Sequence, residues 1–114
     1  MKQDTIVVLD LGSTENARLI DEIRALGICA ELHPHDITLE QLNAIPNVKG
    51  VILNGGPDRV VNGEEKNVAR EICNAPLPVL MVNYMNDEPW PEDEMLRAQT
   101  LSAFVLAICG AEPG

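Results

Sequence analysis

The sequence has few aromatic residues, few basic residues and little cysteine. It contains one Trp, one Tyr and one Phe among 114 residues, so a hydrophobic core must be built from Val, Ile, Leu and Ala, as is typical of a parallel sheet covered by helices. Lys and Arg number 8 against 18 Asp and Glu, which gives a formal net charge of −10. Because no basic cluster is available to neutralise phosphates, we expect neither nucleic acid nor an anionic membrane as a partner.

The three cysteines are Cys29, Cys73 and Cys109. Their odd number and their spacing fit neither a disulfide framework nor a metal site, so we expect reduced thiols, no metal and no cofactor. The apolar stretch from Leu101 to Cys109 is too short to cross a bilayer, and the N-terminus lacks the features of a signal peptide. These features predict a cytoplasmic protein that folds as a single domain over residues 1–114.

Strand and helix patterns alternate along the chain. Thr38 with Gln41 three residues later forms a potential capping box, Gly27 suits the end of a helix, and Pro91 suits a first helical position. The patterns predict strands at 6–9, 29–32, 48–53 and 77–82, and helices at 19–26, 38–42, 64–73 and 91–109.

This alternation with short connections predicts a flavodoxin-like, three-layer α/β/α fold. We expect a four-stranded parallel sheet in the order 2-1-3-4, with right-handed crossovers and helices on both faces. Ligands of such sheets bind beyond the carboxyl ends of the strands. Those ends are predicted at residues 10–13, 33–35, 54–58 and 83–87.

Three features near these ends have weaker interpretations. Asp10 could be a phosphoacceptor, but the third strand ends in Asn54 where a receiver domain has a second Asp. His33-Pro34-His35 provides too few ligands for a closed metal site. The acidic segment 87–94 is either a solvated loop with a helix start, or a docking segment anchored by Trp90.

Five segments follow one another in an order and spacing that carry more information than any one of them. They are Val8-Leu9-Asp10-Leu11-Gly12-Ser13, Ile23-Arg24-Ala25-Leu26-Gly27, Glu31-Leu32-His33-Pro34-His35, Lys49-Gly50-Val51-Ile52-Leu53-Asn54-Gly55-Gly56-Pro57 and Leu77-Pro78-Val79-Leu80. Over residues 4 to about 84 the chain resembles the start of a class I glutamine amidotransferase, and most of all the amidotransferase domain of GMP synthase.

The resemblance implies a chemistry and the residues that would serve it. In the family, a Cys at a nucleophile elbow attacks the glutamine side-chain amide, a His activates the Cys, a Glu orients the His, and the ammonia passes to a synthetase domain that aminates XMP. Carried over, the oxyanion loop is Gly55-Gly56-Pro57, and the backbone N–H groups of Gly56 and Tyr84 are the nearest equivalents of the oxyanion hole.

The nucleophile position departs from the family pattern. The family elbow reads Gly-x-Cys-x-Gly, whereas this chain has Met81, Asn83 and Met85. A carboxamide cannot attack a carbonyl, so we expect no catalytic residue here. Asn83 either still binds glutamine without hydrolysing it or is a turn residue in a remodelled loop. Cys109 lies too far along the chain to replace the missing thiol, and the family's His-x-Glu pair has no counterpart in the sequence.

The sequence therefore predicts a catalytically silent amidotransferase-like domain that acts by binding or regulation, or that persists as a relic. The alternative is a glutamine-hydrolysing subunit that borrows its missing residues from a partner, for which a synthetase subunit is the candidate. We also expect a homodimer, through the edge of the fourth strand or through the last helix, whose apolar residues occupy more than one face. These are Leu101, Phe104, Val105, Leu106 and Ile108.

Overall fold

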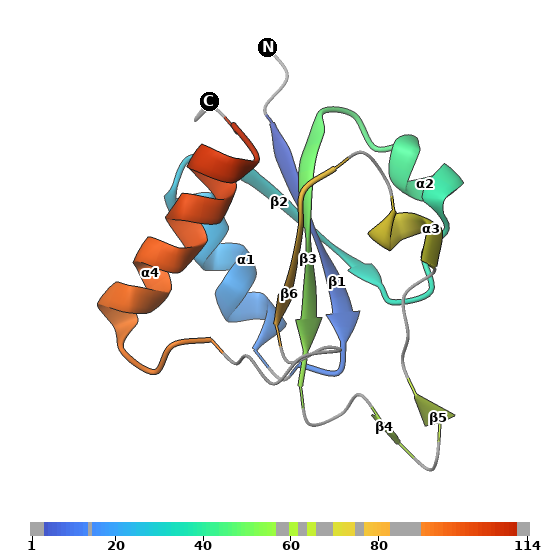
Figure 1. Cartoon of the computed structure of the whole chain (residues 1–114), viewed down its shortest axis with the longest axis horizontal. Coiled ribbons are helices and arrows are strands. Elements are labelled where there is room, and N and C mark those ends of the chain that lie inside the picture. The colour runs from blue at the N-terminus through green and yellow to red at the C-terminus, as the bar shows by residue number, and fades with distance from the viewer. Residues whose placement is uncertain are drawn as a thin grey trace.

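The computed structural model describes residues 4–13, 15–56, 60–61, 64–65, 70–74, 77–82 and 90–111. Strands and helices alternate along most of its length, as Figure 1 shows. In chain order the elements are β1 (Thr5–Leu11), α1 (Asn16–Ala25), β2 (Cys29–Pro34), α2 (Leu39–Asn43), β3 (Val48–Gly55), β4 (Val60–Val61), β5 (Glu64–Glu65), α3 (Arg70–Cys73), β6 (Val79–Val82) and α4 (Glu94–Ser102), which continues as a π-helix over Ala103–Ile108.

The main sheet has four parallel strands in the order β2-β1-β3-β6. Because β6 is the fourth strand of this sheet along the chain, the predicted fold class and the order 2-1-3-4 are confirmed. The paired residues set the register: Ile6 lies between Ala30 and Gly50, and Asn54 lies between Asp10 and Val82. The carboxyl ends of β1, β3 and β6 therefore meet at one edge of the sheet.

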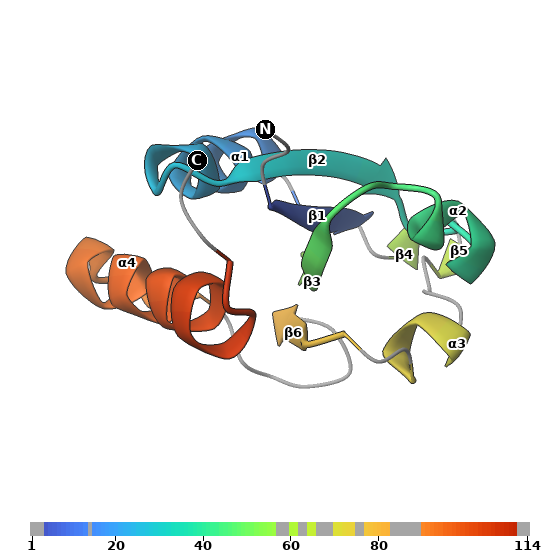
Figure 2. The same ribbon diagram turned by 90° about the horizontal axis from the view of Figure 1, so that it is seen from above.

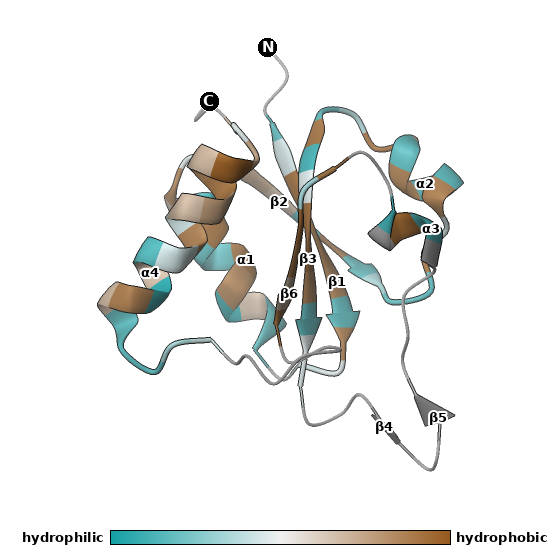
Figure 3. Cartoon of the chain, in the orientation of Figure 1, coloured by the Kyte–Doolittle hydropathy of each residue, from teal (hydrophilic) through white to brown (hydrophobic). Residues whose placement is uncertain are grey.

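Helices cover both faces of this sheet, as the view in Figure 2 shows. Successive side chains of a strand point to opposite faces, so β1 sends Ile6 and Val8 into the cluster beneath α1 and α4, and Val7 and Leu9 into the cluster beneath α2 and α3. All four side chains are fully buried. Figure 3 shows the resulting hydrophobic stripe along the central strands, which is the pattern expected of a parallel sheet buried on both faces.

Two predicted helix signals are confirmed in detail. The Thr38 hydroxyl accepts a hydrogen bond from the Gln41 N–H at 3.1 Å, and the Gln41 side chain accepts one from the Thr38 N–H at 3.0 Å, which completes the capping box at the start of α2. At the end of α1, Gly27 adopts a φ of 82° and donates its N–H to the Arg24 carbonyl. That left-handed conformation favours glycine.

The prediction of a helix over 64–73 is wrong in its first part. Glu64–Glu65 forms β5, which pairs antiparallel with β4 (Val60–Val61), and the described part of the helix, α3, is Arg70–Cys73. The residues that separate the two strands are Asn62 and Gly63, a dipeptide that strongly favours a two-residue hairpin turn. Local turn chemistry thus outweighs the helical spacing that follows it. Residues 66–69 lie outside the described part of the chain.

The last helix begins three residues later than predicted. Pro91 is not helical, and α4 starts at Glu94 with Asp93 as its N-cap. The Asp93 carboxylate accepts hydrogen bonds from the N–H groups of Met95 and Leu96, at 2.9 and 3.2 Å. An Asp at this position satisfies amides that have no partner within the helix, which fixes the helix start. Within the described residues, no helix is both long enough and apolar enough to span a membrane.

Candidate functional site at the carboxyl ends of the strands

The strand that should carry the nucleophile ends where the sequence predicts. Val82 is the last residue of β6 and lies beside Asn54 of β3, so Asn83 directly follows a strand end at the carboxyl edge. Asn83 itself lies outside the described residues, as do Pro57 and Tyr84 of the predicted oxyanion site. Their roles therefore stay predictions, and the described part of the site consists of the strand ends and the elements around them.

The start of the predicted oxyanion loop is tightly packed. Gly55 forms an isolated bridge to Gly12. A Cβ added to Gly56 would lie 2.6 Å from the Ser13 Cα and 2.7 Å from the Gly12 carbonyl oxygen, distances that real Cβ atoms do not reach. Gly12 has a φ of 96° and donates its N–H to the Asp10 carboxylate at 3.0 Å. Glycine at 56 is therefore required for the approach of this loop to the turn after β1.

Asn54 is the central buried polar group of this edge, with only 1% of its surface exposed. Its side-chain amide donates to the Asn16 side-chain oxygen at 2.9 Å, and its oxygen accepts from the Trp90 indole N–H at 3.3 Å. Asn16 in turn donates to the Ser13 carbonyl at 3.2 Å. The polar atoms of Asn54 are therefore used in contacts that join β3, α1 and the segment before α4.

Trp90 covers the strand ends from the side of α4. It packs against the cluster beneath α1 and α4, and the Arg97 guanidinium carbon lies 4.9 Å from the centroid of its ring, within the range of a cation–π contact. The Trp90 side chain is half-buried within its own chain. Residues 92–94 are exposed and include the start of α4, which fits the predicted solvated segment with a helix start, while residues 87–89 lie outside the described residues. A docking role of Trp90 stays a prediction.

Arg97 ties α4 to α1. It is 4% exposed, and its Nε and Nη2 atoms donate to the two carboxylate oxygens of Glu22 over 2.7 to 2.9 Å. A carboxylate oxygen of Glu15 lies 3.8 Å from its Nη1 atom. Two parallel N–H···O bonds fix both the distance and the angle between the groups. Sequence reasoning missed this pair, although Arg97 is the single charged residue between Met95 and Ala111, which was an available signal.

The described thiols lie away from the carboxyl edge. Cys29 is the first residue of β2, and the Cys109 sulfur packs against Gly50 in the amino-terminal half of β3, where an added Cβ on Gly50 would overlap it. Burial raises the pKa of the Cys109 thiol to about 11. Because the thiolate is the nucleophilic form, Cys109 has neither the position nor the protonation state of a catalytic cysteine.

The segment His33-Pro34-His35 was weighed in the sequence as a metal site. The His33 Nε2 atom lies 3.6 Å from a carboxylate oxygen of Glu31, and within the described ranges His, Cys, Asp and Glu form no group of three that could hold a metal ion.

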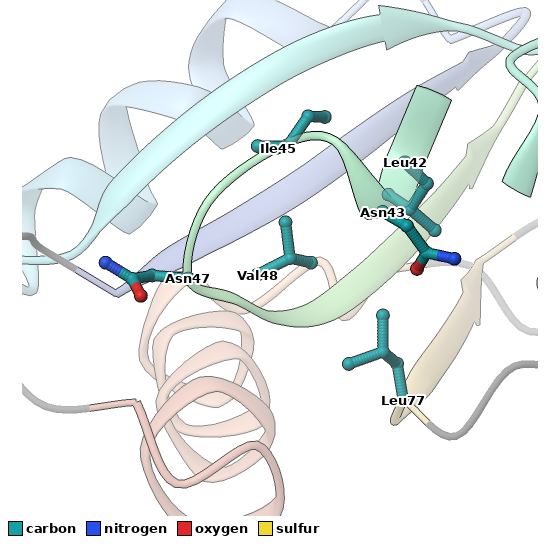
Figure 4. A pocket seen from close by; sticks show the side chains of 6 residues that line it. All are labelled: Leu42, Asn43, Ile45, Asn47, Val48 and Leu77. Atoms are coloured by element: carbon teal, nitrogen blue, oxygen red, sulfur yellow. The ribbon is translucent and has the colours of Figure 1, made fainter. Parts of the chain in front are cut away.

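A cavity of about 280 Å³ lies at the opposite end of β3 (Figure 4). Its side-chain amides, from Asn43 and Asn47, point away from each other in that view, whereas binding sites have convergent polar groups. Its lining residues are Leu42, Asn43, Ile45, Asn47, Val48 and Leu77.

The fold and the strand-end geometry agree with comparison to known families. The family model described as "Glutamine amidotransferase class-I" matches residues 7–84, from β1 to two residues beyond β6. The chain belongs to the class I glutamine amidotransferase family, which confirms the resemblance seen in the sequence. The match ends before α4, so the helix that carries Arg97 lies outside it.

Within that family, the chain is similar to GMP synthases. It is 42% identical, over 98% of its length, to a protein of Bacteroides thetaiotaomicron with the provisional name GMP synthase (glutamine-hydrolyzing) 2. It is 39% and 40% identical, over 73% of its length, to the GMP synthases (glutamine-hydrolyzing) of Staphylococcus saprophyticus and Staphylococcus carnosus. The chain spans 27% of the Bacteroides protein and 16% of each Staphylococcus protein.

Proposed function

We propose that this chain is a catalytically silent amidotransferase domain of the GMP synthase type, which acts by binding or regulation or persists as a relic. The observation that carries the proposal is the residue that follows β6. The strand ends at Val82, and the next residue is Asn83, where the family chemistry needs a thiolate. A carboxamide cannot form the covalent intermediate.

Two features of the described residues support this proposal. Neither described thiol is near the carboxyl ends of the strands, and burial raises the pKa of the Cys109 thiol from 9.0 to about 11, away from the low pKa of an activated cysteine. In addition, the Asn54 side chain is held by Asn16 and Trp90 and is only 1% exposed, so it offers almost no surface to a substrate. Free thiols without a disulfide also suit a reducing cytoplasm, which is the location that we propose.

The test is ammonia release from glutamine by the purified chain. A typical enzyme turns over about 1 to 1,000 times per second, so a micromolar sample with ordinary activity gives an unmistakable signal within minutes. We expect only the background rate. The Asn83→Cys variant should also stay at background, because Met81 and Met85 replace the elbow glycines and the chain offers no His-x-Glu pair.

Two controls make the result decisive. Cys109→Ala and Cys29→Ala each remove one described thiol. Turnover that is lost in the Cys109→Ala variant would overturn the proposal, since it would identify a working nucleophile in this chain. Measurable hydrolysis by Asn83→Cys would refute the argument from the missing base and glycines.

The alternative function is a glutamine-hydrolysing subunit that completes its active site with residues of a partner. The observation in its favour is that the relatives are named glutamine-hydrolyzing GMP synthases. The same assay with an added GMP synthetase domain, itself free of glutaminase activity, separates the two functions. Ammonia release that needs both proteins would establish the alternative, and release by neither would leave the silent domain.

A further inference from the structure

The ring of Trp90 contacts two polar side chains that are almost fully buried. Its indole N–H donates to the Asn54 side-chain oxygen at 3.3 Å, and the Arg97 guanidinium carbon lies 4.9 Å from the centroid of the ring. Asn54 and Arg97 are 1% and 4% exposed. The ring therefore has a hydrogen-bond acceptor at its edge and a cation over its face, as an aromatic ligand has in a binding site. We call Asn54 and Arg97 together the indole site.

Both residues of the indole site are held by partners other than Trp90. Asn54 lies in β3, between β1 and β6, and its side chain donates to the Asn16 side-chain oxygen at 2.9 Å. Arg97 donates to the Glu22 carboxylate over 2.7 to 2.9 Å. Because these contacts do not involve the ring, they keep both groups in place when the ring is absent. A site whose polar groups are already fixed loses little conformational freedom when a ligand binds.

The polar contacts of Trp90 are weaker than those that fix the indole site. Its hydrogen bond to Asn54 is longer than the usual range of about 2.7 to 3.2 Å for N–H···O bonds. Trp90 is half-buried and belongs to neither a helix nor a strand. The bonds between Arg97 and Glu22, by contrast, are short, charged and bidentate. The ring is therefore the part of this arrangement that is released most easily.

From this contrast we infer that the indole site binds a planar, uncharged heteroaromatic ring with an N–H donor, and that Trp90 is the chain's own occupant of the site. A ligand of this class binds when the Trp90 ring leaves, so Trp90 is an autoinhibitory contact. The site lies at the carboxyl end of β3, where sheets of this type bind their ligands.

Each residue of the site selects one property of the ligand. The Asn54 oxygen is buried, and a buried acceptor without a donor is costly, so a ring that lacks an N–H group is rejected. The Arg97 guanidinium favours the electron-rich face of an aromatic ring and repels a cationic one. Glu22 already balances the charge of Arg97, so the site does not attract an anion.

The inference deepens the binding role proposed above, and it rests on that role for its use in the cell. A domain without catalysis acts through what it binds, and the indole site gives the chemical class of that ligand. Trp90 then controls when the ligand is admitted.

The test empties the site by the substitution Trp90→Ala. We expect isothermal titration calorimetry to show that this variant binds indole with a Kd of about 1 mM or lower. Benzofuran has the same shape but an oxygen in place of the N–H group, so it should bind at least about tenfold more weakly. The wild-type chain should bind indole at least about tenfold more weakly than the variant does, because its own ring occupies the site.

The matched control is the double variant Trp90→Ala with Asn54→Leu, which has the same cavity without the acceptor. It should lose the preference for indole over benzofuran. If Trp90→Ala is unfolded, far-UV circular dichroism provides the same test, because indole should then restore the fold at a concentration at least about tenfold lower than benzofuran. Three results would overturn the inference: a folded Trp90→Ala variant that does not bind indole, an unfolded one that indole does not restore, or equal affinities for indole and benzofuran.

Ammonia release from glutamine separates this inference from the proposed function. Trp90→Ala should stay at the background rate, because the residue after β6 is Asn83 in this variant too. Hydrolysis by Trp90→Ala would overturn the silent domain and leave the indole site standing. A lack of indole binding, with ammonia release at background, would overturn the indole site alone.

Discussion

The ion pair of Arg97 and Glu22 provides the strongest test of the interactions that stabilise the fold. It joins α4 to α1 through a guanidinium group of a residue that is only 4% exposed. Replacing Arg97 with Met keeps most of the length of the side chain and its packing but leaves the Glu22 carboxylate without its bidentate partner. Removing one member of a buried ion pair costs about 3 to 5 kcal/mol. The Glu22 side chain is 26% exposed, so water recovers part of that cost.

We therefore expect Arg97→Met to lower the free energy of unfolding by about 3 kcal/mol, the low end of the range for buried pairs. This figure includes about 0.5 to 1 kcal/mol from the lost contact with Trp90. For a chain of this length the change corresponds to a fall in Tm of about 12 °C, at about 4 °C per kcal/mol. Urea unfolding followed by circular dichroism measures it. The fluorescence of Trp90, the single tryptophan, should follow the same unfolding transition, because its ring contacts Arg97.

Arg18→Met is the matched control. Arg18 also lies near Glu22, at 3.6 Å, but half of its side chain is exposed, and exposed pairs contribute about 0 to 1 kcal/mol. The double variant Glu22→Gln with Arg97→Met should cost at least about 1 kcal/mol less than the sum of the single variants, because it leaves no uncompensated charge. Equal losses in Arg18→Met and Arg97→Met, or strictly additive single variants, would refute the reasoning.

Three further predictions follow from the described contacts. Gly50→Ala should lower the free energy of unfolding by about 1 to 3 kcal/mol through overpacking against the Cys109 sulfur, and Cys109→Ala in the same chain should restore most of it; a Gly50→Ala variant of wild-type stability would contradict the contact. The thiol of Cys109 has a pKa of 9.0 when exposed and about 11 in the folded chain; between these pH values the unfolded chain loses the proton and the folded chain keeps it, so stability should fall as pH rises from 9 to 11. The slope should be shallower in Cys109→Ala, and identical slopes would count against the burial of this thiol. Asn54→Leu should cost about 1 to 3 kcal/mol, because it leaves the indole N–H of the half-buried Trp90 without its acceptor, and should change the fluorescence of Trp90; an unchanged spectrum would argue against that hydrogen bond.

The proposed loss of chemistry and the packing of α4 can be understood together. The family match ends just beyond β6, and in this chain the next described element is Trp90, followed by α4. Trp90 and Arg97 fill the space beside the strand ends with the chain's own side chains. A domain without a thiol after β6 gains stability from that filling, whereas a working site has to leave room for its substrate.

Several features were determined by the sequence alone. The run Ile6-Val7-Val8-Leu9 predicted a strand buried on both faces, and Thr38 with Gln41 predicted the capping box found in α2. Short connections between alternating strands and helices predicted the parallel sheet and its order. Each of these signals is local or periodic, so it can be recognised without knowing which distant residues meet. The family, too, was readable from the order and spacing of short segments.

Only the tertiary structure decided how α4 and the segment before it are held. Arg97 meets a carboxylate 75 residues away along the chain, and Trp90 meets an amide 36 residues away. The Cys109 sulfur reaches Gly50 in the same way. No repeat or spacing in a sequence encodes such pairs, because they depend on which faces of the sheet and of two helices come together. The sequence thus determined the scaffold and placed Asn83 directly after β6, while the packing of α4 on α1 decided how Trp90 and Arg97 lie beside the strand ends.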